Sequence, residues 1–109
     1  MPVSVKNQGN IRILLLQGAI GMRESLDFAR ELKSASTGPW ETIVIDLQCP
    51  TINSHCLGTL LATYNTLKSM PKNLKLVSAD STVTRALTSF RIVPLLPLFE
   101  SIQDALAGT

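Results

Sequence analysis

The first forty residues show two different spacings of apolar positions. Period-two alternation on both sides of the polar stretch 7–10, which contains a glycine, predicts an N-terminal β-hairpin. Apolar residues then recur every three or four positions from residue 22, which predicts a helix that ends at Ser36–Pro39. The alternating positions are Val3, Val5, Ile11, Ile13 and Leu15, and the helical stripe is Met22, Leu26, Ala29 and Leu32.

The middle of the chain pairs an apolar strand with a second helix. Ile43–Leu47 is a run rich in β-branched residues, which predicts a strand at the centre of a sheet, covered on both faces. A second helical stripe follows, and either Asn53 or Ser54 is suited to cap its helix, so we expect the helix to begin at 53–55. The apolar positions of this stripe are Leu57, Leu60, Leu61, Tyr64 and Leu67.

The last third of the chain repeats this alternation of strand and helix. Leu74–Val77 predicts a strand, Ser81 is suited to cap a helix, and residues 92–98, which include two prolines, predict a short strand near residue 93. The helical stripes in this part are Val83, Ala86, Leu87 and Phe90, followed by Ile102, Ala105 and Leu106.

This order of elements predicts a fold of the α/β class. We expect the order ββαβαβαβα, with a mixed β-sheet of about four to five strands and about four helices, because crossover helices make successive strands parallel and the hairpin adds an antiparallel one. No repeat marks a boundary, which predicts a single domain over residues 1–109. Loops beyond the carboxyl ends of parallel strands tend to hold functional residues, which draws attention to residues 48–56.

Composition and charge exclude several classes of function. The chain is 45% hydrophobic and 17% charged, with a formal net charge of +2 and no block of like charge, so we expect no nucleic-acid partner. No apolar run approaches the roughly 20 residues that span a bilayer, and no secretion signal is visible, which predicts no membrane insertion and a cytoplasmic location. One histidine and two cysteines, Cys49 and Cys56, form no ligand pattern, so we expect free thiols, no metal and no cofactor.

The segment Ile43–Leu61 carries a family resemblance. A strand ending in Asp46–Leu47, a short loop, the sequence INSHCLG at Ile52–Gly58 and an apolar helix follow one another. In STAS domains, which typify the bacterial anti-sigma-factor antagonists, a strand ending in Asp-Leu is followed by an apolar residue, then Asp, Ser, Ser, Gly, Leu, Gly and an apolar helix. The chain therefore resembles a STAS domain over its whole length, most sharply from 43 to 61.

The resemblance implies that Ser54 is a regulatory residue. In that family the serine directly after the Asp is phosphorylated by a serine kinase that also acts as the anti-sigma factor. The unphosphorylated protein binds the kinase and frees a sigma factor, the phosphorylated protein lets go, and a phosphatase restores binding. This chain would then be a binding protein and not an enzyme, with a partner site formed by Asn53, Ser54, His55, Cys56 and Leu57.

Three neighbours of Ser54 depart from the family pattern. Asn53 stands for the Asp, His55 for the second Ser and Cys56 for the Gly. Asn53 keeps the size and the capping ability of Asp but lacks its negative charge. A constitutive STAS adaptor in a signalling or transporter-associated complex, which needs no phosphorylation, is therefore the alternative function.

Other interpretations of these residues, most of them purely structural, also remain open. Asn53 and Ser54 could serve only as a helix cap, and Cys56 could sense oxidants at a helix start, although a small core filler is expected. A hydrolase built on Ser54, His55 and Cys56 is not expected, because neighbouring residues on a helix point in different directions. We expect His55 at the surface or against the partner, and the apolar stretch Leu95–Phe99 closing the core under the last helix in preference to forming a docking edge.

Overall fold

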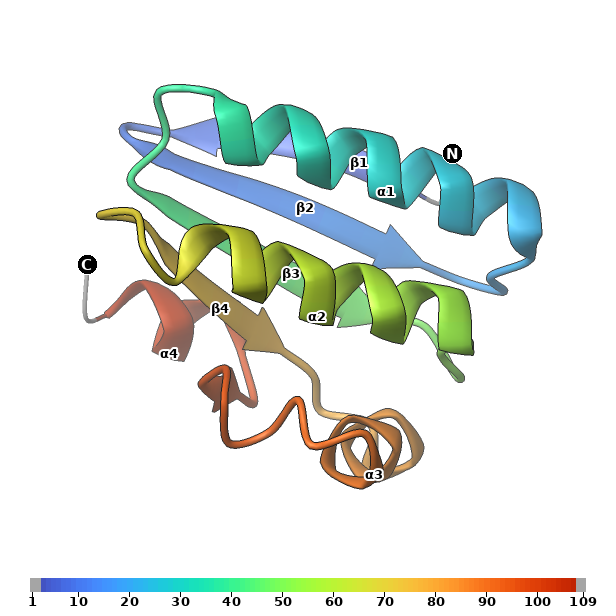
Figure 1. The fold of residues 1–109 in the computed structure, drawn as a ribbon. Coiled ribbons are helices and arrows are strands. Elements are labelled where there is room, and N and C mark those ends of the chain that lie inside the picture. Colours follow the sequence, from blue (N-terminus) through green and yellow to red (C-terminus); the bar gives the residue numbers. More distant parts are fainter. Residues whose placement is uncertain (1–2, 108–109) are drawn as a thin grey trace.

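The alternating elements of the sequence build one mixed sheet with helices on both faces (Figure 1). The computed structural model describes residues 3–107. Its elements are β1 (Val3–Gln8), β2 (Ile11–Gln17), α1 (Met22–Thr37), β3 (Thr42–Gln48), α2 (Ser54–Leu67), β4 (Asn73–Val77), α3 (Ser81–Ser89), β5 (Leu98–Phe99) and α4 (Ile102–Leu106). The α/β class and the order ββαβαβαβα are thus confirmed. Residues 1, 2, 108 and 109 lie outside the described part, so the domain span 1–109 stays a prediction.

The strands follow one another across the sheet in the order β1-β2-β3-β4-β5. β1 pairs with β2 in the antiparallel sense, as a hairpin requires, and every later pair is parallel. The hairpin turns at Gly9, whose φ of 62° lies in the left-handed region that glycine adopts without steric cost. The predicted mixed sheet with an early antiparallel element is confirmed.

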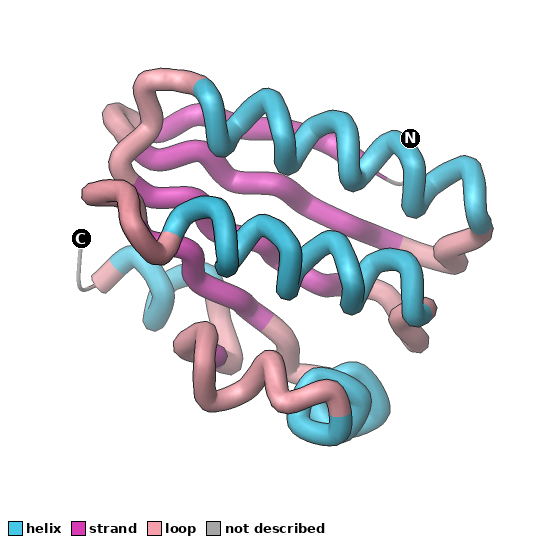
Figure 2. The backbone as a smooth tube through the Cα atoms, viewed as in Figure 1, coloured by secondary structure: helices cyan, strands magenta, loops and turns pink. Residues whose placement is uncertain are grey.

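Strand β3 is covered on both faces, as its apolar run predicts. Ile43 and Ile45 lie in a core shared with α1, α2 and α3, whereas Val44 lies in a second core under α4. α1 and α2 lie side by side across one face of the sheet (Figures 1 and 2). All three β3 side chains are fully buried.

Helix α1 buries a face different from the predicted one. Met22 and Leu26 are 61% and 51% exposed, whereas Phe28 and Leu32 are fully buried together with Ser25. The serine can be buried because its hydroxyl donates to a carbonyl one turn earlier in the chain, Gly21 O at 3.0 Å. The predicted stripe was therefore wrong at its first two positions, because it counted only apolar residues.

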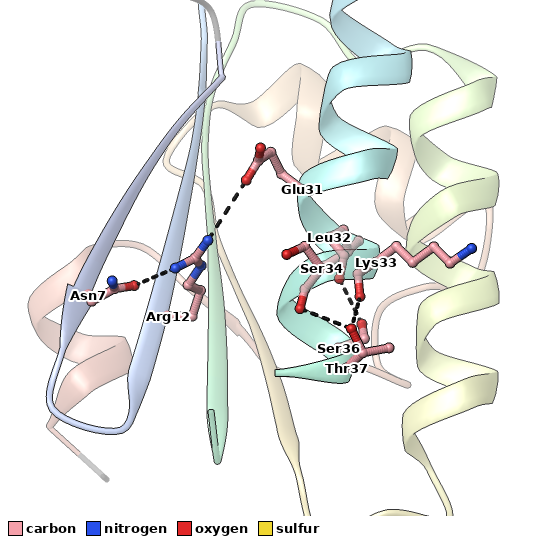
Figure 3. A network of polar contacts seen from close by, with 8 residues as sticks. All are labelled: Asn7, Arg12, Glu31, Leu32, Lys33, Ser34, Ser36 and Thr37. Atoms are coloured by element: carbon pink, nitrogen blue, oxygen red, sulfur yellow. Dashed lines mark hydrogen bonds and ion pairs between the residues drawn. The ribbon is translucent and has the colours of Figure 1, made fainter. Parts of the chain in front are cut away.

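Arg12 on β2 joins the hairpin to α1 (Figure 3). Its guanidinium donates to Asn7 Oδ1 at 2.9 Å, lies 3.9 Å from the Glu31 carboxylate and lies 5.2 Å from the centre of the Trp40 ring. Each of these contacts alone contributes little to the stability of the fold. Together they link the hairpin to Glu31 of α1 and to Trp40 in the loop that follows this helix.

Two predictions about the second half of the chain were wrong in detail. Asp80, not Ser81, caps α3, because its carboxylate accepts from the main-chain N–H groups of Thr82 and Val83. The fifth strand is Leu98–Phe99, not a segment near residue 93. The reason is that residues before Pro97 form turns, and only the two residues after it can pair with β4.

The apolar stretch before α4 closes the core, as expected. Leu96 is buried in the larger core, and Phe99 packs in the smaller core with Ile102 of α4. Leu95 is an exception in this stretch, since it is 47% exposed. Phe90 follows the end of α3 and is 51% exposed, so the predicted stripe of that helix was wrong at its last position.

We predict that Asp46 on β3 makes stability depend on pH. Burial raises the pKa of its carboxyl, and a hydrogen bond from Gln48 Nε2 at 3.0 Å opposes this effect. A raised carboxyl pKa in the folded chain means that stability is lost as pH rises through it. Asp46→Asn, which can still accept from Gln48, should therefore melt at a higher temperature than the wild type at pH 7 but not at pH 3. An equal difference in melting temperature at both pH values would contradict the prediction.

Candidate functional site

The segment that follows β3 lies at the edge of the sheet where β2 and β3 end. Helices α1 and α2 both start at this edge (Figure 1). The sequence produces this arrangement because a buried strand must be followed by a loop that leaves the core before a covering helix can begin. Residues 49–53 form that loop, and the predicted functional segment therefore lies at the carboxyl edge of the sheet.

Asn53 is the cap of α2, and Ser54 is the first helical residue. Asn53 has an extended backbone with φ −93° and ψ 167°, and its Oδ1 accepts from the main-chain N–H of Cys56 at 2.9 Å. This is the standard role of asparagine before a helix. Of the two candidate caps in the sequence, the structure uses Asn53.

Ser54 is exposed at the start of α2. Its hydroxyl makes no hydrogen bond within residues 3–107, and the main-chain N–H groups of Ser54 and His55 have no partner there either. Unpaired N–H groups and the positive end of the helix dipole both favour a negative group at this place. A phosphate on Ser54 is therefore compatible with the folded helix.

The other residues of the predicted partner site differ in exposure. Cys56 is fully buried and Leu57 is 3% exposed, so both belong to the core of the free chain. His55 is half-buried, and its Nδ1 is buried with no hydrogen-bond partner in the described chain, so it is not fully solvated; contact with the partner stays a prediction. Ser54 is thus the most accessible of the five residues.

The chemistry of the cysteines does not support a redox role. Burial raises the pKa of the Cys56 thiol, and this effect outweighs a hydrogen bond with Ser25 that lowers the same pKa. Burial also raises the pKa of the Cys49 thiol to about 11. Both cysteines are free. Because Cys56 is fully buried and a thiol of raised pKa is a poor nucleophile, the structure favours a core residue over an oxidant sensor.

A buried serine from another helix completes the site. Asn53 Nδ2 donates to Ser25 Oγ at 2.6 Å, and Ser25 Oγ lies 3.4 Å from Cys56 Sγ. Ser25 is fully buried on α1. Sequence reasoning missed this residue because it lies on the polar side of the predicted apolar stripe, and no local pattern indicates a contact with a residue 28 positions away.

Residues 3–107 contain neither a metal-binding cluster nor a membrane-spanning helix. No group of three or more His, Cys, Asp or Glu side chains within residues 3–107 is arranged to hold a metal ion. No helix in that part of the chain is long and apolar enough to cross a membrane. Ser54, His55 and Cys56 make no hydrogen bonds with one another, and no triad is assembled from them.

Comparisons with known proteins agree with the geometry. The family model of the STAS domain matches residues 2–105. The fold is similar to that of an anti-sigma factor antagonist from Mycobacterium paratuberculosis, with a TM-score of 0.87 at 20% identity over 97% of this chain and 91% of that one. The anti-sigma factor antagonist SpoIIAA in its unphosphorylated form gives a TM-score of 0.71 at 12% identity, covering 97% and 94%.

A third similar structure is a STAS domain protein from Planctomyces limnophilus. Its TM-score is 0.79 at 16% identity, covering 97% of this chain and 95% of that one. At these identities the solved structures show a shared fold. No curated protein matches the chain significantly.

The burial of the two cysteines generates a prediction about their reactivity. With a pKa of about 11, Cys49 in the folded chain should react with iodoacetamide at pH 8 roughly a hundredfold more slowly than a free thiol. Cys56 should also resist, and both should react in denaturant. Intact-mass analysis over time measures this. Labelling of folded Cys56 at the rate of a free thiol would contradict the assignment as a core filler.

Proposed function

Because the chain belongs to the STAS domain family, we propose that it is an anti-sigma-factor antagonist whose partner binding is controlled by phosphorylation of Ser54. The partner is a serine kinase that also acts as the anti-sigma factor, and a phosphatase restores binding. The chain itself is a binding protein without turnover of its own. A cytoplasmic location, which such a partner implies, stays a prediction.

The observation that carries the proposal is the position of Ser54. The family's acceptor serine matches a residue that is exposed, is first in a helix and stands directly after the capping residue. The N–H groups next to it have no partner in the described chain, so a phosphate can be accommodated without loss of an existing hydrogen bond. One of the structurally similar proteins is the anti-sigma factor antagonist SpoIIAA in its unphosphorylated form.

Exposed apolar residues on the two helices that start at this edge are consistent with protein binding. Met22 and Leu26 are exposed apolar residues on α1, whose first turn is joined to Asn53 through Ser25. Leu61 on α2 is also 36% exposed. These exposed apolar side chains are available for contact with a partner. A phosphate at the edge of this surface would weaken binding through desolvation and charge repulsion.

The alternative function is a constitutive adaptor in a signalling or transporter-associated complex. Asn53 is the observation that favours it, because the carboxylate of the family pattern is absent and phosphorylation could have been lost. The two functions differ in one measurable property. An adaptor stays bound to its partner in the presence of ATP, whereas the regulated antagonist is released.

We predict that a negative charge at Ser54 weakens partner binding and leaves the fold intact. Phosphate adds about −1.5 to −2 charges, and 2–3 kcal/mol, roughly a 30- to 150-fold loss of affinity, is enough for release. Ser54→Asp should reproduce part of this loss, and Ser54→Ala should bind but resist release by ATP. Calorimetry with the partner recovered on Ser54→Ala measures the affinities, and thermal melts serve as the folding control. Equal affinity of Ser54→Asp and wild type, with a complex that ATP leaves intact, would favour the adaptor.

A second prediction uses Gly58, which lies one turn after Ser54 on the same side of α2. It is exposed, and nothing lies within 4 Å of the position that a Cβ would take. Gly58→Ala should therefore stabilise the folded chain by about 0.5–1 kcal/mol. If the partner lies against this turn, the affinity of Gly58→Ala for the partner should be at least about threefold lower than that of the wild type.

The matched control for Gly58→Ala is Asn65→Ala, an exposed position on the same side of α2 but two turns farther from Ser54. It should also stabilise the helix, because alanine has the higher helix propensity, and it should leave partner affinity unchanged. Unchanged affinity for Gly58→Ala would place the partner away from this turn.

A further inference from the structure

Four groups from two helices meet directly beneath the Ser54 turn. Ser25 Oγ lies 3.0 Å from the carbonyl oxygen of Gly21, 2.6 Å from Asn53 Nδ2 and 3.4 Å from Cys56 Sγ. Ser25 and Cys56 are both fully buried. This cluster is the direct side-chain link between the first turn of α1 and the cap of α2.

A count of protons gives the cluster one consistent arrangement. A carbonyl oxygen only accepts, so Ser25 donates its single hydroxyl proton to Gly21 O. An amide nitrogen only donates, so Ser25 Oγ accepts from Asn53, and the neutral Cys56 thiol must then be a donor as well. Asn53 Oδ1 is occupied by the N–H of Cys56 at 2.9 Å. The Ser25 hydroxyl proton, one Asn53 amide proton and Asn53 Oδ1 are thus all engaged within the cluster.

The arrangement requires an amide at position 53. Asn53 donates with one end of its side chain and accepts with the other, which an aspartate cannot do. With Asp at this position, Ser25 would have to withdraw its proton from Gly21 O and donate it to the new carboxylate. The bond in which Ser25 accepts a proton from residue 53 therefore depends on the asparagine that distinguishes this chain from the STAS pattern.

We infer that Ser25 is a positioning residue for Ser54, a role that rests on the proposed function of Ser54 as phosphate acceptor. Ser25 fixes the rotation of the Asn53 amide, the amide holds the Cys56 N–H, and this bond closes the turn that presents the Ser54 hydroxyl to a kinase. Ser25 touches neither the kinase nor the phosphate. It acts through Asn53.

The experiment compares Ser25→Ala with a matched control, Ser36→Ala. Ser36 is also a buried serine on α1, 7% exposed, but its hydroxyl donates to Leu32 O at 2.8 Å within the same helix. The first measurement is hydrogen exchange at the Cys56 amide by NMR, with the Val44 amide in β3 as an internal reference. Ser25→Ala should speed exchange at Cys56 about threefold to tenfold, the effect of losing one hydrogen bond, and Ser36→Ala should not.

The second measurement is phosphate transfer to Ser54 by the kinase partner. Ser25→Ala should lower kcat about threefold to tenfold without raising KM for the chain. Because Ser25 acts through Asn53, the double variant Ser25→Ala/Asn53→Ala should be no slower than Asn53→Ala alone. Additive effects in this cycle would reduce Ser25 to a general core residue.

The two measurements separate failure of this inference from failure of the proposed function. If wild type accepts no phosphate, the proposed function fails, and the exchange measurement still decides whether Ser25 holds the Asn53 turn. If wild type accepts phosphate and Ser25→Ala matches Ser36→Ala in both measurements, the inference about Ser25 is wrong and the proposed function stands.

Discussion

The burial of β3 on both faces is the constraint on which the rest of the structure depends. Ile43 and Ile45 need α1 and α2 above them, and Val44 needs α4 below. Because each face must be covered, the chain has to leave the sheet at the end of β3 and return as a helix. The loop that makes this turn ends at Asn53, so the packing of the strand fixes the place where Ser54 is exposed.

Much of the fold could be predicted from the sequence, because periodicity reports local burial. The hairpin, β3 and the start of α2 followed directly from alternating or continuous apolar positions. The burial of α1 could not be predicted in the same way. Serine hydroxyls can bond to carbonyls of their own helix, so Ser25 and Ser36 are buried where a count of apolar residues expects a polar surface. The position of β5 depended on turn geometry around Pro97, which periodicity does not describe.

Only those features of the candidate site that depend on neighbouring residues in the sequence were predictable. The cap at Asn53 and the exposed Ser54 follow from residue preferences at helix starts. The contact between Asn53 and Ser25 joins residues 28 positions apart and is a consequence of tertiary packing. The burial of Cys56 has the same origin, and it turns a residue with the right position for a reactive thiol into part of the core.

The proposed switch combines an exposed serine with a hydrogen-bonded cluster beneath it. In the proposed switch, the cluster beneath Asn53 holds the turn, and regulation needs only a charge at Ser54, which the helix start would accept and the partner surface would not. The most direct test is intact-mass analysis of the chain after incubation with its kinase partner and ATP. The account predicts a gain of about 80 Da, the mass of one phosphate, for wild type and no gain for Ser54→Ala. An unchanged mass for wild type, or the same gain in Ser54→Ala, would contradict it.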